Sequence, residues 1–299
     1  MATLLQLVQQ AATEMGLVSP TQVVGNTSSD VVQMLALINA VGYELQLEYD
    51  WQAIDTEYRF TTQYSIQNGT TTNGSAVVTG LTSTTGLDAT YSVSGTGINQ
   101  DTYILTVDSP TQVTLNQNCT ATGTVSLTFG KTKYSMPSDY DRQIDRTHFD
   151  KSKRWEMLGP ETPQQWQWLK SSYISTGPRI RYRILGGYFQ IWPIPATSEY
   201  LGFEYISKNW ARSSTGTAQG SFLSDTDTCV FPDRLMVIGL KKKYFEVKGF
   251  NPAQFQADYM RELSIAKSND HGSATLSMAP RISSILIGWE NIPDSGYGS

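Results

Sequence analysis

The sequence is poor in charge. Charged residues make up 16% of its 299 residues, well under the roughly 25% of typical soluble domains. The net charge is −5, so the chain lacks the basic field that would wrap nucleic acid. Thr, Ser, Gln and Asn replace the missing charges, which is common in subunits whose surfaces are partly covered by neighbours.

Cysteine and histidine are nearly absent. Cys119 and Cys229 lie far apart, without metal or redox spacing, which predicts two unpaired thiols in a reducing cytosol. His148 and His271 fit no metal-ligand pattern such as HExxH. Solvated or packing roles are therefore expected for both histidines.

Catalytic motifs are missing as well. The sequence contains no GxSxG, no P-loop and no GxGxxG ahead of a helix. A glycosidase needs only two carboxylates, and the candidates are Glu57, Asp139, Asp141 and Asp145. Because carboxylates are common, this pattern carries little weight. We predict no enzyme, no cofactor and no metal.

No window of the sequence approaches the roughly 20 apolar residues that a membrane span needs. The apolar residues between Leu4 and Met15 recur with helical spacing and follow no basic segment, unlike those of a signal peptide. We therefore expect no membrane span, and a chain that stays soluble until it meets a partner.

Helical periodicity is concentrated at the two ends of the chain. Residues 2–15 and about 28–50 predict two amphipathic helices, and Phe231–Lys267 predicts two more, separated by Gly249 and Asn251-Pro252. The last two helices should bury two apolar stripes: Met236, Leu240, Tyr244 and Val247, then Phe255, Tyr259, Leu263 and Ala266. The simplest packing is one bundle in which distant parts of the chain meet.

Between the helical ends the period changes to two. Residues 54–64 predict a strand, and residues 75–129 carry almost no charge and contain short strands at roughly 8–12-residue spacing, as in a small sandwich or barrel. We interpret 75–129 as an insertion whose removal would join Tyr64–Ile66 and Lys133–Met136 in one hairpin. The alternative, a long decorated loop of the main sheet, stays open.

The main region then resumes with a short strand at 155–158, a helix capped by Thr162-Pro163, and strands at 179–185, 188–192 and 200–207. Gly186-Gly187 predicts a two-residue hairpin turn. The predicted fold class is α+β: a helical bundle from the two chain ends with an antiparallel β region, plus an inserted small all-β domain of sandwich or immunoglobulin-like type. The expected domains are a main domain (1–66 and 131–270), an inserted domain (67–130) and an extended C-terminal tail (271–299).

Candidate contact residues fall into three groups. The basic run Lys241, Lys242 and Lys243 could meet an acidic partner or DNA phosphate, or simply face water. Arg179, Arg181 and Arg183 alternate on a strand and so share one face, where they could form interface salt bridges or lie in water. Trp168 could anchor an interface, because Trp is enriched at hot spots, or belong to a Trp-rich core.

The tail is a further candidate for contacts. It carries Arg281 and the large apolar residues Ile282, Ile285, Leu286, Ile287 and Trp289, with little regular period. Left exposed, such residues would promote aggregation. They either fold back onto the chain or dock as an extended segment on another subunit, and we favour docking.

Several motifs of the main domain are similar to those of a known family. They are Tyr-Ser-Met-Pro-Ser-Asp-Tyr-Asp-Arg at 134–142, Arg-Trp-Glu-Met-Leu-Gly-Pro at 154–160, Pro-Gln-Gln-Trp at 163–166, Arg-Tyr-Arg-Ile at 181–184, Phe-Gln-Ile-Trp-Pro at 189–193 and Phe-Glu-Tyr-Ile-Ser-Lys-Asn-Trp at 203–210. The chain resembles the head-to-tail adaptors of short-tailed phages over roughly 1–66 and 131–270. Residues 75–129 depart from the plain family pattern and look like the small β inserts of many virion proteins.

The resemblance implies a virion structural protein, assembled in the host cytoplasm and placed in the tail at the portal vertex. Such adaptors form a twelve-fold ring on the portal protein, and their C-terminal tails climb the portal wall. The implied partners are the portal, a tail nozzle or hub protein, neighbouring copies, and tail fibres through residues 75–129. Genomic DNA would pass through the ring during ejection without specific binding. The alternative is a tail-associated cell-wall hydrolase or carbohydrate-binding protein.

Overall fold

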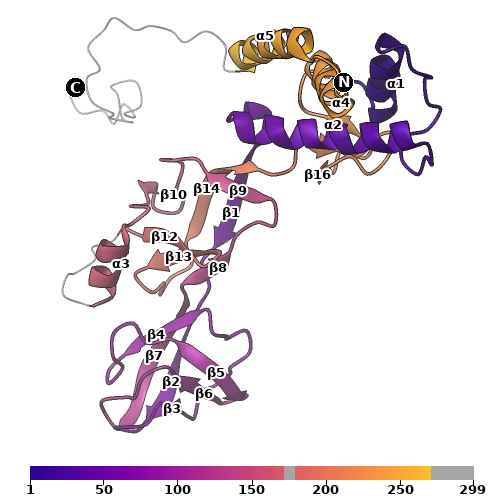
Figure 1. Cartoon of the computed structure of the whole chain (residues 1–299). Coiled ribbons are helices and arrows are strands. Elements are labelled where there is room, and N and C mark those ends of the chain that lie inside the picture. The colour runs from indigo at the N-terminus through magenta and orange to yellow at the C-terminus, as the bar shows by residue number, and fades with distance from the viewer. Residues whose placement is uncertain (172–178, 271–299) are drawn as a thin grey trace, which may run out of the picture.

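The chain adopts a mixed α+β fold. The computed structural model describes residues 1–171 and 179–270, and this part holds five α-helices and several small antiparallel sheets. The molecule is elongated, with four helices at one end and the strands extending away from them (Figure 1). Both ends of the described chain therefore lie at the helical end, as the sequence predicted.

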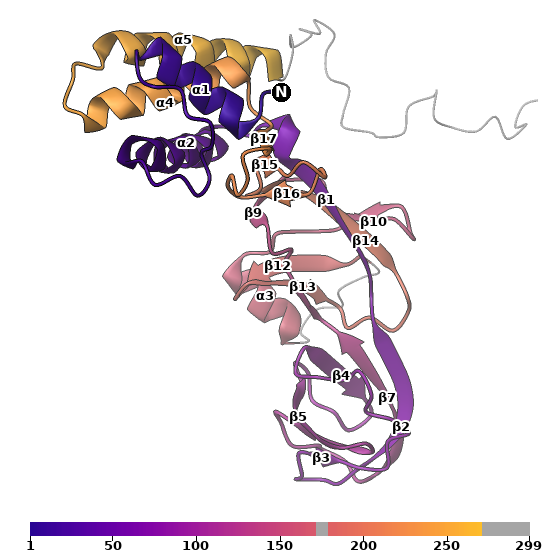
Figure 2. The ribbon, with the colours of Figure 1, turned by 90° about the vertical axis from the view of Figure 1, so that its right-hand side faces the viewer.

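The four terminal helices are α1 (Leu4–Glu14), α2 (Ser29–Glu48), α4 (Asp233–Val247) and α5 (Ala253–Asp270). The helix α4 is central, because it contacts α1, α2 and α5, and Figure 2 shows the four packed together. At the N-terminus, Thr3 and Gln6 form a capping box that satisfies two free N–H groups of α1. The predicted bundle of sequence-distant helices is confirmed.

The predicted apolar stripes of the last two helices are confirmed except at Phe255, which is only partly buried, and at Val247. Met236, Leu240 and Tyr244 are buried on α4, and Tyr259, Leu263 and Ala266 are buried on α5. Val247 was expected in the first stripe, but it is 57% exposed, because α4 ends there and Gly249, at φ +77°, turns the chain toward α5.

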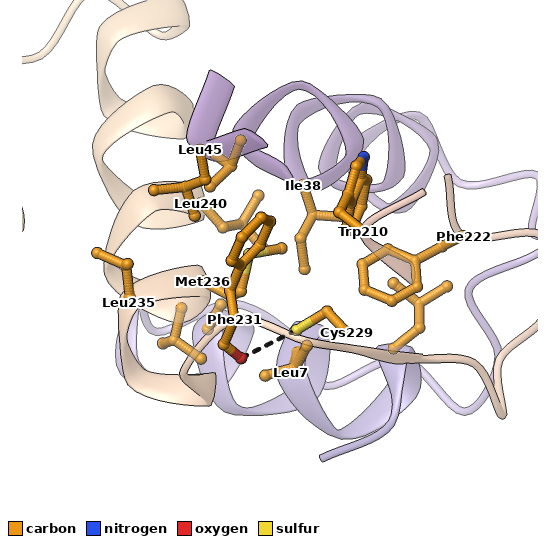
Figure 3. Close-up of a cluster of buried hydrophobic side chains, with 14 of the residues drawn as sticks. Leu7, Ile38, Leu45, Trp210, Phe222, Cys229, Phe231, Leu235, Met236 and Leu240 are labelled. Atoms are coloured by element: carbon orange, nitrogen blue, oxygen red, sulfur yellow. Dashed lines mark hydrogen bonds between the residues drawn. The ribbon is translucent and has the colours of Figure 1, made fainter. Parts of the chain in front are cut away.

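The bundle core also takes in side chains from the chain that leads into α4. Trp210, Phe222 and Phe231 are buried among Leu7, Ile38 and Met236 (Figure 3). An added Cβ on Gly42 of α2 would lie 2.3 Å from the Trp210 ring, so this ring packs directly on the helix backbone. The segment before α4 thus seals the bundle at the side facing the strands.

Both cysteines are free and buried, as predicted. The Cys229 thiol donates to the carbonyl oxygen of Phe231 at 3.3 Å (Figure 3). Burial raises the pKa of this thiol to about 12. Cys229 therefore acts as a small apolar group in the core rather than as a nucleophile.

The longest sheet joins distant parts of the chain. Strand β1 (Asp55–Thr61), which follows the short 3-10 helix η1 (Gln52–Ile54), pairs along its length with β14 (Tyr200–Ser207). On its other edge β14 pairs with β9 (Tyr140–Gln143) and β10 (Phe149–Asp150), and β10 pairs with β11 (Trp155–Glu156). Because β1 follows α2 almost directly, this sheet continues from the bundle.

A second sheet follows the order β12 (Arg181–Leu185), β13 (Tyr188–Trp192) and β8 (Lys133–Ser135). Gly186 and Gly187, at φ +62° and +79°, form the two-residue turn that was predicted. The helix α3 (Pro163–Lys170) lies beside this sheet in both views. Three short strands, β15 (Ala211–Arg212), β16 (Ala218–Gln219) and β17 (Thr228–Cys229), form a sheet under the bundle.

Residues 64–131 form two three-stranded sheets. One has the order β2 (Tyr64–Thr71), β7 (Gly123–Lys131) and β4 (Tyr91–Gly95), and the other has β3 (Val77–Val78), β6 (Gln112–Leu115) and β5 (Ile104–Ser109). Their apolar residues form a cluster of their own, which includes Val78, Val113, Leu127 and Phe129. Strand β7 has one buried and one wet face, since Leu127 and Phe129 are buried and Ser126 is exposed.

The hairpin expected between Tyr64–Ile66 and Lys133–Met136 is wrong. Tyr64 pairs with Gly130 inside the β2–β7 pair, whereas Lys133–Ser135 pairs with Tyr188–Gln190 of β13. The two segments already have other partners, because β2 is paired with β7 and β8 is paired with β13. The chain instead crosses between sheets at Thr62 and Gln63, where the Gln63 N–H donates to the Tyr134 hydroxyl at 3.0 Å.

Candidate assembly interface

The three lysines of α4 face their own subunit. Lys241 Nζ lies 2.8 Å from Glu14 of α1, and Lys243 Nζ lies 2.5 Å from Glu44 of α2. Lys242 lies over the Tyr259 ring of α5, 4.7 Å from its centroid, and 4.0 Å from Glu246. The three side chains are only 15–18% exposed. The basic run therefore ties α4 to its three neighbouring helices.

These contacts belong to a wider charge pattern that was not predicted from the sequence. Residues 1–54 contain no Lys or Arg, and every carboxylate in them meets a cation from later in the chain. The pairs are Glu14–Lys241, Asp30–Lys248, Glu44–Lys243, Glu48–Lys267 and Asp50–Arg142. The hydrogen bond from Lys241 is the main cause of the lowered pKa of Glu14. The absence of Lys and Arg before Arg59 is the feature of the sequence from which this pairing could have been predicted.

Of the predicted arginine group, Arg181 and Arg183 lie on β12, next to α3, and Arg179 precedes the strand. Arg181 Nη1 donates to Glu161 at 2.6 Å, so one of the three guanidinium groups is neutralised within the chain. Arg183 is partly buried and Arg179 is exposed. Neither has an ion-pair partner among residues 1–171 and 179–270. These two remain the available cations of the group.

Helix α3 presents its two tryptophans to opposite sides. Thr162 and Gln165 form a capping box, and Pro163 occupies the first turn, as the sequence indicated. Trp166 is buried with Leu169 and Trp192, whereas Trp168 is 50% exposed. The spacing of two residues explains this split, because positions i and i+2 do not share a helix face. Trp168 is thus a large apolar side chain on the exposed face of α3.

Three contacts fix the 64–131 region against the rest of the chain. Lys170, at the end of α3, lies 2.7 Å from Asp101, and Lys133 Nζ lies 4.8 Å from the centroid of the Tyr103 ring. An added Cβ on Gly130 would lie 2.5 Å from the carbonyl oxygen of Pro195. This close backbone approach requires glycine at position 130.

The possible catalytic groups are engaged in structural contacts. Asp139 accepts hydrogen bonds from the hydroxyls of Tyr205 and Ser207 at 2.9 and 2.6 Å. Glu57 is bonded to Arg59 and Lys151, and hydrogen bonds from these two groups lower its pKa to about 2. Asp141 pairs with Arg142. Within the described ranges no cluster of His, Cys, Asp and Glu could hold a metal ion.

His148 is a packing residue. Its ring is stacked on Tyr182 and Phe203, with centroids 4.0 and 5.0 Å away, and its Nδ1 lies 3.0 Å from the Tyr182 hydroxyl. Burial lowers the pKa of His148 to about 4, so the ring is neutral near pH 7. The packing role predicted for His148 is confirmed, while His271 lies outside the described residues.

The remaining predictions from the sequence concern portal binding by the tail and the absence of a membrane span. The tail residues Arg281, Ile282, Ile285, Leu286, Ile287 and Trp289 lie outside the described residues. Among the described helices, none is long and apolar enough to cross a membrane.

A comparison with models of protein families shows which family the chain belongs to. The family model described as SU10 adaptor protein matches residues 103–281, more than half of the chain. The chain belongs to the SU10 adaptor protein family. The family is one of phage head-to-tail adaptors, so the protein is a phage virion structural protein, and no catalytic role is implied. None of the curated proteins matches the chain.

The range matched by the family model contains several of the candidate contact residues. It includes α3, β12 and α4, and with them Trp168, Arg179 and Lys241. It begins at Tyr103, inside the 64–131 region, so α1 and α2 lie outside the match. The family assignment therefore rests on the β region and the C-terminal helices of this SU10-family adaptor.

Proposed function

We propose that this SU10-family adaptor forms a ring beneath the portal protein, extends the DNA channel and carries the lower tail. The observation that carries the proposal is the place where α5 ends. Asp270 bonds back to the N–H of Gln52, so the chain leaves the bundle at a fixed point of the helical end (Figure 1). The apolar tail that follows in the sequence can then reach a neighbouring protein while the bundle stays intact.

The tail is the proposed portal-binding segment. Truncation after Asp270 should leave a folded protein that no longer binds the portal, because the bundle contacts described above end at Asp270. Replacing Ile282, Ile285, Leu286 and Ile287 by Ser should have the same effect, whereas Ser283→Ala with Ser284→Ala, a matched control in the same segment, should not. Co-sedimentation with purified portal measures binding, and thermal melting measures folding. A truncated protein that still attached to the portal would refute this role.

The subunit contacts of the ring are proposed to involve Arg179, Arg183 and Trp168. The support is that the two arginines have no carboxylate partner within the described chain and that Trp168, on the neighbouring helix α3, is half exposed. Arg181 is already paired with Glu161, and the lysines at 241–243 hold the helical bundle together, so these four cations are not expected to form ring contacts. The ring is expected to hold twelve copies, and its net acidic subunits suit a conduit along which DNA slides without specific binding.

The region 67–130 is proposed to be an inserted domain that holds tail fibres or a nozzle protein. Its separate apolar cluster and its position at the end remote from the helices support this division. Residues 72–122 can be removed by closing the paired residues Thr71 and Gly123 with an Asn-Gly turn, with Leu127 and Phe129 replaced by Thr. The shortened protein should bind the portal normally and lose the fibres. Unchanged fibre attachment would refute the role.

A further inference from the structure

A hollow on the outer face of the β1–β14 sheet carries two unusual arginines. The hollow has a volume of about 560 Å³, and its lining includes Arg146, Arg154, Lys151, Phe149, Glu57 and Glu204. It lies beside β10, which Figure 2 shows on the opposite side of the β region from α3. It is therefore separate from the α3–β12 surface proposed above for ring contacts.

Both arginines are held in a backbone conformation that long side chains rarely adopt. Arg146 and Arg154 have φ values of +63° and +59°, and the described chain contains one other non-glycine residue of this kind, Asp101. Gly and Asn adopt this conformation at lower cost. Strained positions of this type cluster at functional sites. Two of the three border the same hollow, so the backbone strain is concentrated beside these arginine side chains.

The charges of the hollow are only partly satisfied within the chain. Glu57 is neutralised by Arg59 and Lys151, and Asp150 accepts the N–H groups of Ser152 and Lys153. Arg146 and Arg154 have no hydrogen-bond or ion-pair partner among the residues that the structure describes. The exposed carboxylate of Glu204 has no side-chain partner there either. The hollow thus offers two free guanidinium groups and one free carboxylate.

We propose that this hollow is a docking site for an acidic segment of another virion protein, whose carboxylates pair with Arg146 and Arg154. Guanidinium groups bind carboxylates in a bidentate manner, which gives both strength and orientation. The inference rests on the proposed function, because it requires an assembled particle. A nucleic-acid backbone fits less well, because it carries phosphates along its whole length and some would face Glu57 and Glu204, whereas a protein segment can place carboxylates at the two arginines alone. A protein segment can also supply a donor for Glu204 and an apolar contact for Phe149.

The first experiment separates docking from folding. Arg146→Asn with Arg154→Asn removes both guanidinium groups and places a residue that tolerates the left-handed conformation at each position. The double variant should melt at the same or a higher temperature than the wild type, and particles built with it should lose the docked protein about tenfold or more, corresponding to about 1.4 kcal/mol. Lys208→Gln with Arg212→Gln, which removes two other exposed cations without partners, is the matched control and should assemble normally. Normal assembly of the Asn variant would overturn the proposal.

The second experiment identifies the partner chemistry. Arg146→Lys and Arg154→Lys keep the charge and introduce amines that a zero-length carbodiimide reagent joins to carboxylates in direct contact. In assembled particles, mass spectrometry should find these lysines linked to Asp or Glu of another protein. Links only to Glu57 or Glu204 of the same chain, no links at all, or formaldehyde links to DNA would each overturn the proposal. Particles that lack this chain altogether would instead refute the proposed function, and the inference would fall with it.

Discussion

Acidification should weaken the fold through one buried ring, His148. The ring is 1% exposed, its Nε2 is buried without a hydrogen-bond partner, and burial lowers its pKa from 6.5 to about 4. The unfolded chain exposes the imidazole, which then takes up a proton near its ordinary pKa. Below that pH the unfolded state binds more protons than the folded state, so stability falls as the pH falls.

The size of the effect follows from the two pKa values. Between pH 6.5 and pH 4 the contribution changes by roughly 1.4 kcal/mol per pH unit, and by roughly 3.4 kcal/mol in total. Between pH 7.5 and pH 5 the expected loss is about 2 kcal/mol. The contribution is complete above the ordinary pKa of histidine and fully lost below pH 4. Asp145 opposes the shift through its charge, so Asp145→Asn should lower the pKa further.

A substitution that cannot titrate isolates this contribution. His148→Phe keeps an aromatic ring between Tyr182 and Phe203 but loses the contact with the Tyr182 hydroxyl. The loss of this contact costs the same free energy of unfolding at both pH values. The free energy of unfolding is measured by urea titration at pH 7.5 and pH 5 for both proteins. Carboxylates with lowered pKa values, such as Glu57, also reduce stability in acid, but they are present in both proteins and cancel.

The expected result is that the wild type loses about 2 kcal/mol more than His148→Phe between the two pH values. Parallel pH dependence of the two proteins would refute the reasoning. It would mean that His148 has the same pKa in the folded and the unfolded protein, and hence that water reaches its ring in the folded state.

Three further substitutions test the packing and the charge pattern. Gly42→Ala should destabilise the bundle by about 1–3 kcal/mol, because its Cβ would lie 2.3 Å from the Trp210 ring; an unchanged urea midpoint would contradict this contact. Gly130→Ala should loosen the 64–131 region, because its Cβ would meet the Pro195 carbonyl oxygen at 2.5 Å; faster limited proteolysis of that region is the readout, and an unchanged rate would count against it. Glu14→Gln should cost less than about 1 kcal/mol, and the cost should shrink further in 1 M NaCl; a loss that persists at high salt would show that more than charge is involved.

Local structure was largely readable from the sequence. The helices follow from apolar spacing, and their ends follow from particular residues, such as the Thr162 cap and Gly249. The Gly186-Gly187 turn was predicted because both positions need the left-handed backbone conformation that glycine adopts easily. These features depend on neighbours within a few residues, so a single sequence contains the information for them.

Strand partners were harder to predict than strands. The join between Tyr64–Ile66 and Lys133–Met136 looked continuous, yet each segment pairs elsewhere. Tyr64–Ile66 lies in β2, which pairs with β7, and Lys133–Ser135 pairs with β13 from much later in the chain. The charged hollow was missed for a similar reason. Arg146 and Arg154 lie on different turns, and neither their backbone conformation nor their lack of partners can be read from spacing. The docking role of the tail residues remains a prediction.

The charge pattern bears directly on the truncation experiment. The first 54 residues are acidic and contain no cation, so their helices repel one another unless the C-terminal helices supply lysines. The last of those lysines is Lys267, which lies 3.0 Å from Glu48, and the last backbone tie of the bundle is made by Asp270. A chain that stops after Asp270 therefore retains every ion pair that closes the bundle, whereas one that stops before Lys267 does not. Loss of portal binding in the first truncation thus reports on the tail itself, and the second truncation, which also removes the Lys267–Glu48 pair, should melt at a slightly lower temperature.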